Sequence, residues 1–246
     1  AGRCLPEDEV PEGAQTLSLS GTEFRRLLTS GAPVPDWFTF PEVVRELSRA
    51  YPPRGQQGFT VFLTGLSGSG KSATARALQS LLLAEGRRVT MLDGDEVRRH
   101  LSAGLGFSRE GRDTNILRIG YVAGEITRHG GAVICAAIAP YEATRQQVRE
   151  RVSAVGGFVL VHVSTPIEVC ERRDAKGLYA KARAGVLKEF TGVSDPYEPP
   201  ESPTLAIDTT SVSPHDAASM VLEHLKKEGY VGEAAASDSD PALAGR

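Results

Sequence analysis

The chain has 246 residues, a formal net charge of −3 and 40% hydrophobic residues, which suffices for one full domain with a sizeable core and an appendage. A weakly acidic chain gives no reason to expect nucleic acid or a membrane surface as a partner. The longest apolar run, GAVICAAIAP, is about half of the ~20 residues that a membrane span needs. Three distant cysteines, Cys4, Cys135 and Cys170, argue against a disulfide framework or a zinc site, so we expect a cytoplasmic protein.

The first 57 residues are punctuated by proline and carry two short helical patterns. SGTEFRRLL begins with a capping box, Ser20 with Glu23 three residues later, and stops before Gly31. FPEVVREL predicts a second helix with Pro41 at its first position, and PPRGQQG predicts a linker after it. Two such helices cannot close a core alone. Because the chain also begins with Ala and has no signal peptide, we expect it to be cut from a longer polypeptide.

From 58 to about 230, apolar runs alternate with helical patterns. The runs that we interpret as buried strands are 59–63, 88–92, 132–138, 158–163 and 204–208. The helical segments are 71–85, 95–103, 110–129, 141–154, 166–174 and 214–228. Strands and helices in alternation require right-handed crossovers, so the pattern predicts an α/β fold with a five-stranded parallel sheet and helices on both faces.

The stretch GLSGSGKS follows the first predicted strand, opens the next helix and fits the phosphate-binding pattern GxxxxGK[ST]. Glycines let consecutive N–H groups point at phosphate oxygens at the positive end of a helix. Lys71 is expected to reach the β- and γ-phosphates, and Ser72 to offer a hydroxyl to Mg²⁺. The residues predicted to bind ATP are Gly65, Ser67, Gly68, Ser69, Gly70, Lys71, Ser72 and Ala73. No guanine-reading NKxD motif and no motor-type Asp-Glu strand end accompany the loop.

Two carboxylates stand at the end of the second predicted strand, in VTMLDGDEVRRHL. Asp93 and Asp95 flank a glycine at the edge where open α/β sheets bind their ligands. Such a pair can hold Mg²⁺ through water and can orient or deprotonate an acceptor hydroxyl. Arg98, a helical turn later, projects toward the same edge. An acidic turn that only caps a helix is the alternative that these residues alone leave open.

The segment that follows, LGFSREGRDTNILRIGYVA, resembles adenylyl-sulfate kinase (APS kinase), together with the two motifs before it. IAPYEATR and CERRDAKGLYAKARAGVLKEFTGVSDPYEPPESP resemble the same family, and the similarity covers about 58–228. The resemblance implies a P-loop nucleoside-triphosphate hydrolase-like fold that uses ATP and Mg²⁺ in sulfate activation. The implied reaction moves a phosphoryl group from ATP to the 3′-hydroxyl of adenosine 5′-phosphosulfate (APS). Its products are 3′-phosphoadenosine 5′-phosphosulfate (PAPS) and ADP.

The resemblance also assigns roles to individual residues. The residues expected to bind APS are Asp95, Arg98, Phe107, Arg112, Asn115, Ile138, Ala139, Lys176, Leu178 and Phe190. Phe107 and Phe190 can sandwich the adenine, at roughly 1–3 kcal/mol per stacked base. Arg98 and Arg112 offer planar, forked donors to the phosphosulfate. The residues expected to act in catalysis are Lys71, Asp93, Asp95 and Arg173, with Ser72 and Asp93 on the metal.

The basic, glycine-hinged segment 171–191 is interpreted as a lid that closes over both nucleotides and excludes water. Arg173 matches the family's RD pair and could neutralise charge on the transferring phosphoryl group. Where many family members have serine in ISPY, this chain has Ala139 in IAPY. Without that hydroxyl no phosphorylated enzyme can form at this position, so we expect direct, in-line transfer.

The N-terminal stretch LSLSGTEFRRLLTSGAPVPDWFTFPEVVRELSRAYPP resembles the C-terminal end of ATP sulfurylase, the enzyme that makes APS. We therefore expect a sulfurylase-like fragment and linker over 1–57, an APS kinase domain over 58–230 and a disordered tail over 231–246. The sulfurylase's H-x-x-H element is missing, so that reaction is expected to be absent. We expect a homodimer fused to an ATP sulfurylase domain, although the residues do not fix the oligomeric state.

Two other functions stay open at this point. Fungal ATP sulfurylases carry a kinase-like domain that binds nucleotide without turnover, and IAPYE and DPYE here resemble it. That silent domain has lost its phosphate loop and its DGD pair, whereas this chain keeps Lys71, Ser72, Asp93 and Asp95. The other alternative is a kinase for a different small hydroxyl substrate, such as a nucleoside or a sugar acid.

Overall fold

The computed structural model describes residues 17–232 and divides the chain into two compact units, Ala1–Pro53 and Arg54–Arg246. The first unit contains the helices α1 (Gly21–Ser30) and α2 (Pro41–Ala50). The hydroxyl of Ser20 accepts a hydrogen bond from the N–H of Glu23 at 3.1 Å, as the capping box predicts. Gly31 ends α1 in the left-handed conformation, with φ of 70°. Both helices of the predicted appendage are present.

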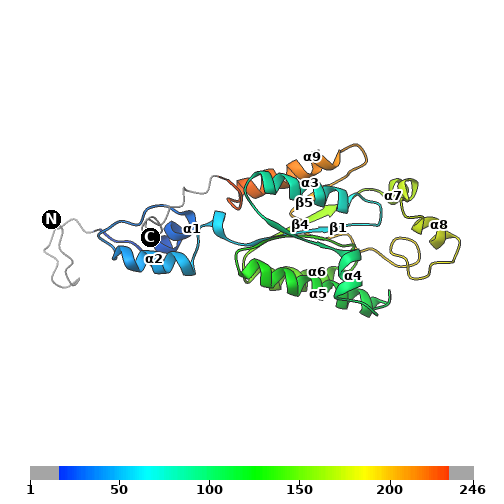
Figure 1. The fold of residues 1–246 in the computed structure, drawn as a ribbon, viewed down its shortest axis with the longest axis horizontal. Coiled ribbons are helices and arrows are strands. Elements are labelled where there is room, and N and C mark those ends of the chain that lie inside the picture. Colours follow the sequence, from blue (N-terminus) through cyan, green and yellow to red (C-terminus); the bar gives the residue numbers. More distant parts are fainter. Residues whose placement is uncertain (1–16, 233–246) are drawn as a thin grey trace, which may run out of the picture. The chain divides into compact units, whose positions relative to one another are not determined.

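The second unit is built on a five-stranded parallel sheet, which confirms the predicted fold class (Figure 1). Its strands are β1 (Phe59–Thr64), β2 (Val89–Asp93), β3 (Ala132–Ala136), β4 (Gly157–Val163) and β5 (Leu205–Ile207). The spatial order is β2-β3-β1-β4-β5, so β1 lies in the middle, with every one of its residues buried. The chain leaves β1 and β3 toward opposite faces of the sheet, which opens a crevice at their carboxyl ends.

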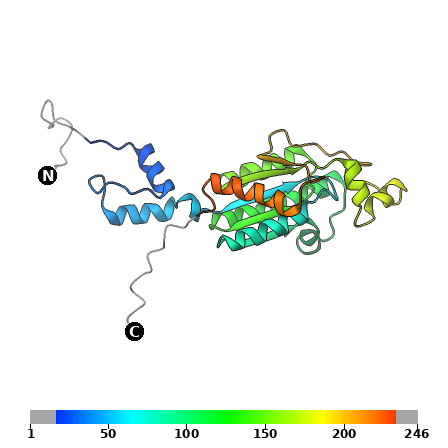
Figure 2. The ribbon, with the colours of Figure 1, turned by 90° about the horizontal axis from the view of Figure 1, so that it is seen from above.

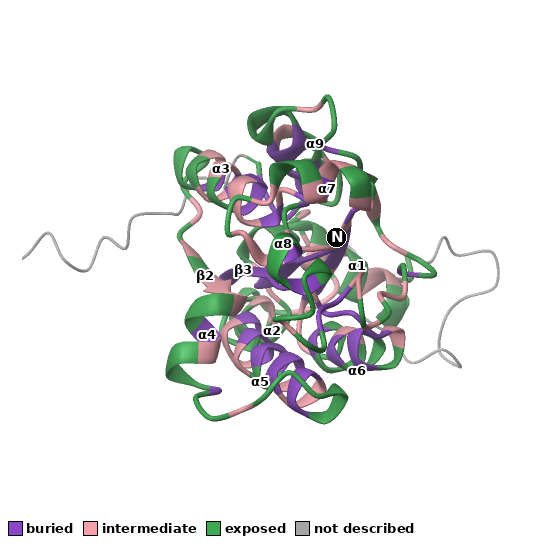
Figure 3. Cartoon of the chain, turned by 90° about the vertical axis from the view of Figure 1, so that its right-hand side faces the viewer, coloured by how far each residue is buried: buried purple, intermediate pink, exposed green. Residues whose placement is uncertain are grey.

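Helices cover both faces of this sheet. The helices α3 (Lys71–Ala84) and α9 (Pro214–Lys227) lie on one face, and α5 (Arg109–Arg128) and α6 (Glu142–Ser153) lie on the other (Figures 1 and 2). Each face has its own apolar core, with Leu78, Leu82 and Val221 in the first and Ile119 and Val148 in the second. Figure 3 shows the buried residues concentrated along the strands and on the helix sides that face them.

Short elements occupy the carboxyl end of the sheet. They are α4 (Gly94–His100), α7 (Ile167–Arg173) and α8 (Leu178–Arg183), and a 3₁₀ turn at Arg54–Gln56 precedes β1. The helix α8 falls inside the segment that the sequence indicates only as a lid. Within residues 17–232, none of the helices is both long and apolar enough to cross a bilayer.

The compact second unit begins before the boundary taken from the sequence. Residues of the predicted linker belong to it, because Arg87 donates hydrogen bonds to the carbonyls of Gly55 and Gln57 at 2.6 and 2.8 Å. At the other end, Tyr230 and Val231 pack in the first core. The rest of the predicted tail, 233–246, lies outside the described residues, as does the N-terminal stretch 1–16 with Cys4. Cys135 and Cys170 are buried free thiols.

A stability test follows from the close packing of α5 on α6. A Cβ at Gly120 would lie 2.6 Å from Cγ2 of Val148, so Gly120→Ala should lower the free energy of unfolding by roughly 1–3 kcal/mol. At Gly124, one turn later, the nearest atom is Cγ of Arg151 at 3.6 Å. There Gly124→Ala should instead raise stability by up to about 1 kcal/mol, because alanine favours the helix. Urea unfolding measures both changes, and shifts in the same direction would contradict this packing.

Candidate functional site

A cavity of about 810 Å³ opens at the carboxyl edge of the sheet. Its walls come from the loop after β1, the ends of β2 and β3, the first turns of α5, the lid and the loop before α9. All predicted site residues line it except Gly65 and Ser69. A cavity of this size is at the large end for a small-molecule site. The fold therefore brings together residues from six separate stretches of the chain.

The phosphate loop is tightly curled, and its glycines are required by space. Gly68 and Gly70 have φ values of 74° and 100°, a conformation that other residues adopt only at a cost. A Cβ at Gly65 would lie 2.5 Å from the carbonyl oxygen of Val163. A Cβ at Gly70 would lie 3.0 Å from Oγ1 of Thr209. The loop therefore rests directly on the ends of the neighbouring strands.

The fully buried Ser69 explains why part of this loop does not line the cavity. Its carbonyl accepts hydrogen bonds from the hydroxyls of Thr165 and Thr209, at 3.0 and 2.8 Å. The two hydroxyls also contact each other at 2.9 Å. These residues fasten the loop from beneath, while Ser67, Gly68 and Gly70 face the cavity.

Lys71, at the start of α3, is buried with only 8% of its surface exposed. Its Nζ donates to the carbonyl oxygen of Leu66, in the same loop, at 2.6 Å. Burial lowers the pKa of Lys71 to about 8 because a buried ammonium loses its hydration. The short hydrogen bond of this ammonium is to a neutral carbonyl oxygen. An incoming phosphate oxygen would supply a negative charge beside it.

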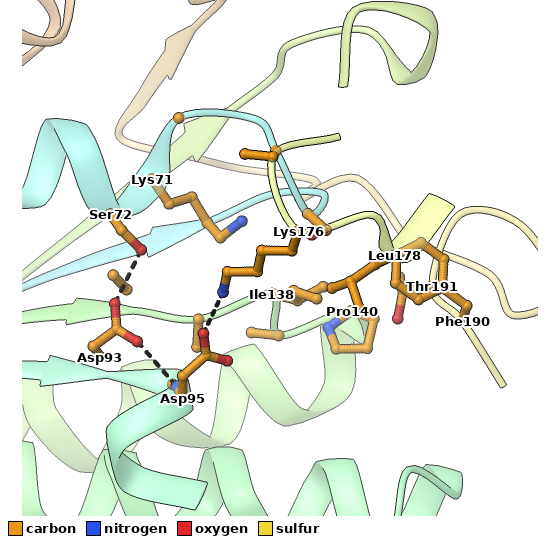
Figure 4. A pocket seen from close by; sticks show the side chains of 18 of the residues that line it. Lys71, Ser72, Asp93, Asp95, Ile138, Pro140, Lys176, Leu178, Phe190 and Thr191 are labelled. Carbon is orange, nitrogen blue, oxygen red and sulfur yellow. Dashed lines mark hydrogen bonds and ion pairs between the residues drawn. The ribbon is translucent and has the colours of Figure 1, made fainter. Parts of the chain in front are cut away.

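Ser72 and Asp93 place two side-chain oxygen groups next to each other beside the phosphate loop (Figure 4). The hydroxyl of Ser72 donates to Oδ2 of Asp93 at 2.9 Å, and Oδ1 of Asp93 accepts from the N–H of Asp95 at 2.9 Å. Asp93 thereby caps α4 and also lines the cavity. Within residues 17–232, no three His, Cys, Asp or Glu side chains gather as a metal cluster. Two hard oxygen ligands fit Mg²⁺, which takes most of its ligands from water and phosphate.

Asp95 forms an ion pair with Lys176, which lies between α7 and α8 (Figure 4). The pair joins the end of β2 to the lid across the mouth of the cavity. Both side chains are more than half exposed, at 61% and 63%, so the contact contributes little to stability. It can open without a large cost.

The wall opposite the phosphate loop carries aromatic, cationic and amide groups. The guanidinium of Arg98 lies 4.5 Å from the centre of the Phe107 ring. Burial, and then the neighbouring charge of Arg112, lower the pKa of Arg98. Phe190 packs edge-on against Tyr179, with ring centres 5.0 Å apart. Two neighbouring cations beside aromatic rings form a place where an anion with an attached base would be favourable.

Asn115 is buried at 3% exposure on α5 and lines this wall. Its Oδ1 atom is buried without a hydrogen-bond partner in the protein. An unpaired buried carbonyl is costly, and such groups in native proteins generally have a ligand or a water as partner. This amide therefore indicates a polar ligand on the α5 side of the cavity.

Arg112 lines the cavity, but its donors serve mainly the protein. Its Nε donates to the carbonyl of Phe107 at 2.6 Å, and one terminal nitrogen binds Oδ2 of Asp195 at 2.7 Å. It also contacts the hydroxyl of Thr191 and the carbonyl of Glu189. Its part in binding an anion stays a prediction, and what the contacts define is a tie between α5 and the end of the lid.

Sequence reasoning missed the residues after β5. Thr209, Val212 and Pro214 line the cavity at the end beyond the phosphate loop. Arg173 donates to the carbonyl of Thr209 at 2.5 Å and to that of Gly68 at 3.3 Å. It thus joins the phosphate loop to the loop before α9. The position of Thr209 directly after the last predicted strand was the available signal, since all such positions lie at one edge of a parallel sheet.

A phosphate loop between a central parallel strand and a helix, with a carboxylate at the end of the next strand, defines a P-loop kinase. Residues 57–208 match the sequence profile of the adenylylsulphate kinase family. The chain belongs to that family. Residues 4–50 match the ATP-sulfurylase family, in agreement with the resemblance of the N-terminal stretch.

Some similar proteins match nearly the whole chain, and others match a smaller share of it. A sulfate adenylyltransferase of Aspergillus terreus is 55% identical over 227 residues, which are 92% of this chain and 40% of that protein. A hexameric APS kinase from Thiobacillus denitrificans has a TM-score of 0.76 and 49% identity, over 93% of this chain and 41% of that one. The Mycobacterium tuberculosis APS kinase in complex with AMPPNP and APS has a TM-score of 0.67 and 41% identity, over 69% of this chain and 98% of that one. The chain thus spans about 40% of the length of the curated relatives.

The buried Lys71 gives a prediction with a definite sign. Its pKa near 8 lies below the ordinary lysine value of 10.5, so the unfolded chain keeps the proton to higher pH than the folded protein. The charge therefore destabilises the fold at pH 7, and the penalty is relieved between about pH 8 and 10.5. Lys71→Met should raise the free energy of unfolding at pH 7 by roughly 1–3 kcal/mol, with a smaller gain at pH 9.5.

Denaturant titrations measure the gain in the free energy of unfolding at both pH values. The control is Lys176→Met at an exposed position, for which the change in stability should be the same at both pH values. The same Lys71→Met variant should lose the thermal stabilisation that wild type gains from ATP with Mg²⁺. A less stable variant that still responds to the nucleotide would contradict the role of Lys71 in the phosphate loop.

Proposed function

We propose that this chain phosphorylates the 3′-hydroxyl of APS with ATP and releases PAPS and ADP. One observation carries the proposal. A single cavity joins the phosphate loop to a wall that bears two neighbouring guanidinium groups and the unpaired amide oxygen of Asn115. A site that only bound or hydrolysed a nucleotide would need no such second wall.

The donor half would hold ATP by its phosphates. Lys71 would exchange its hydrogen bond to the carbonyl of Leu66 for hydrogen bonds to the β- and γ-phosphates. The negative charge of these phosphates would stabilise the ammonium, which has lost its hydration through burial. Ser72 and Asp93 would hold Mg²⁺, whose charge would neutralise that developing on the phosphoryl group. Arg173 and Pro214 line the cavity beyond this loop, where a planar base could lie.

The acceptor half would hold APS by both of its ends. The neighbouring charges of Arg98 and Arg112 suit a phosphosulfate anion, which would relieve their mutual repulsion. Phe107 and Phe190 offer ring faces to the adenine. The Oδ1 atom of Asn115 would accept a hydrogen bond from the nucleotide and gain the partner that it lacks in the protein.

Transfer would be direct and in line. Ala139 lines the cavity without any hydroxyl that could carry the phosphoryl group. Asp95, once its ion pair with Lys176 opens, would orient the 3′-hydroxyl or take its proton. Closure of the predicted lid, 171–191, would exclude water, whose attack on ATP is the competing reaction. Near its two ends, Arg173 contacts Thr209, and Arg112 contacts Glu189 and Thr191.

The alternative is a silent module that binds nucleotide without turnover. It remains relevant because the fungal relatives are named sulfate adenylyltransferase and not kinase. The features that argue against it are chemical. Lys71, Ser72 and Asp93 are all present and line the same cavity, where Ser72 donates a hydrogen bond to Asp93. A module without turnover has no need for a metal-binding pair aimed at the phosphates.

Asn115 provides a test of the acceptor half. Asn115→Leu should raise the KM for APS by roughly tenfold to a hundredfold, because a buried hydrogen bond to the ligand is lost. The KM for ATP should change by less than about twofold, and the free protein should be no less stable, since an unpaired buried oxygen is removed. Ser102 is the matched control, because its Oγ atom is also buried and unpaired but lies outside the cavity. Ser102→Ala should leave both KM values unchanged, and an equal rise for both nucleotides in Asn115→Leu would move the APS site elsewhere.

Initial-rate kinetics tests the reaction itself. Direct transfer needs both nucleotides bound at once, so double-reciprocal plots for ATP and APS should intersect, with PAPS as the phosphorylated product. Asp93→Asn should reduce kcat by roughly a hundredfold or more, because it removes the charged oxygen of the metal pair. Parallel lines, or labelled phosphate retained on the protein after incubation with ATP alone, would exclude direct transfer. Binding of APS without any PAPS would favour the silent module.

A further inference from the structure

Arg145, on α6, is a buried cation that the proposed reaction does not use. Only 2% of its surface is exposed, and it does not line the cavity. Its Nε donates to Oε2 of Glu142 at 3.0 Å. Its two terminal nitrogens donate to the carbonyl oxygens of Ala139 and Glu198, each at 2.6 Å. The guanidinium therefore joins two distant backbone segments that occur in the motifs IAPYE and DPYE.

Ala139, the residue whose carbonyl Arg145 holds, has an unusual backbone. Its φ of 46° is in the left-handed region, which costs energy for a residue with a Cβ. Among the described residues only one other non-glycine residue has a φ well inside the left-handed region, Glu189 at 54°. The carbonyl of Glu189 is also held by a buried arginine, Arg112. Both strained residues line the cavity.

The turn 138–140 forms the part of the wall labelled by Ile138 and Pro140 in Figure 4. Its three carbonyls accept their shortest hydrogen bonds from three different segments, and Thr64 also lies 3.4 Å from the carbonyl oxygen of Ala139. The hydroxyl of Thr64 donates to that of Ile138 at 2.6 Å, Arg145 to that of Ala139, and the N–H of Glu198 to that of Pro140 at 2.9 Å. Arg145 contacts both the turn and Glu198, so it also sets their spacing.

We propose that Arg145 is a positioning residue for the phosphoryl acceptor, which holds the turn 138–140 in its left-handed conformation and thereby shapes the acceptor wall. The inference rests on the proposed function for the identity of the acceptor. Burying a charge is costly, and apolar replacements of buried ion pairs often leave proteins as stable or more stable. A fork that reaches two carbonyls and a carboxylate at once supplies geometry that an apolar side chain would not.

The test removes both members of the buried ion pair, because a lone buried charge would destabilise the fold. In Arg145→Met with Glu142→Gln, the KM for APS should rise by about tenfold or more, as expected when a buried contact that shapes a site is lost. The KM for ATP should stay within about twofold, since the phosphate loop is untouched. Adding Ala139→Gly to this double variant should lower the KM for APS again, by at least half of the increase on a logarithmic scale. The reason is that glycine adopts a positive φ without strain.

Arg149, one turn further along α6, is the matched control. It also donates to a backbone carbonyl, that of Ser202 at 2.6 Å, and lies 5.9 Å from the centre of the Phe158 ring. Arg149→Met should leave the KM values for both nucleotides unchanged. Circular dichroism and thermal unfolding establish that each variant is folded before its kinetics are compared.

Three results would overturn the proposal: an unchanged KM for APS in the folded double variant, an equal rise for both nucleotides, or no recovery with Ala139→Gly. Titration calorimetry of APS with ADP bound measures the same effect without turnover. A wild-type protein that binds APS but makes no PAPS would therefore contradict the proposed function alone. The ratio of the dissociation constants for APS between the variants and wild type would still test the role of Arg145.

Discussion

The curled loop between β1 and α3 has to leave its amide groups free for a ligand and yet keep one shape. Backbone groups that serve a ligand cannot also be satisfied by the protein, so the loop needs support from beneath. The structure supplies it through the carbonyl of Ser69, which the hydroxyls of Thr165 and Thr209 hold from the ends of β4 and β5. Glycines allow this close approach. The position of Lys71 and of Ser72, which donates a hydrogen bond to Asp93, depends on that support.

The wall that bears Arg112 and Asn115 poses a different problem, since part of its backbone has to be held in strained conformations. Two buried arginines, Arg112 and Arg145, do this by holding carbonyls of residues with positive φ. Arg112 ties α5 to the end of the lid, and Arg145 ties the turn 138–140 to the segment around Glu198. Strained backbone at such positions is typical of functional sites, where the surrounding structure enforces it. The wall is thus specified by side chains that mostly lie behind it.

The match to the family is continuous over residues 57–208. This range contains the phosphate loop, Asp93, Asp95 and the segment 171–191. A sulfate adenylyltransferase of Aspergillus terreus is similar to this chain over 92% of its length, which takes in more than the kinase match alone. In this chain, Ser72 and Asp93 share a hydrogen bond, and Lys71 lies buried within the loop beside them. These groups lie together beside the phosphate loop and line the same cavity.

The sequence alone determined the layered parallel sheet, because apolar runs separated by helical periods leave few other topologies. It also determined the phosphate loop and Asp93, since local spacing after a strand fixes where such groups lie. The roles of Arg112 and Arg145 were decided only by the tertiary structure. Each acts on carbonyls far away in the chain, such as those of Glu189 and Glu198, and no local pattern encodes such contacts. The same holds for Asn115, whose missing partner is visible only once the cavity has closed around it.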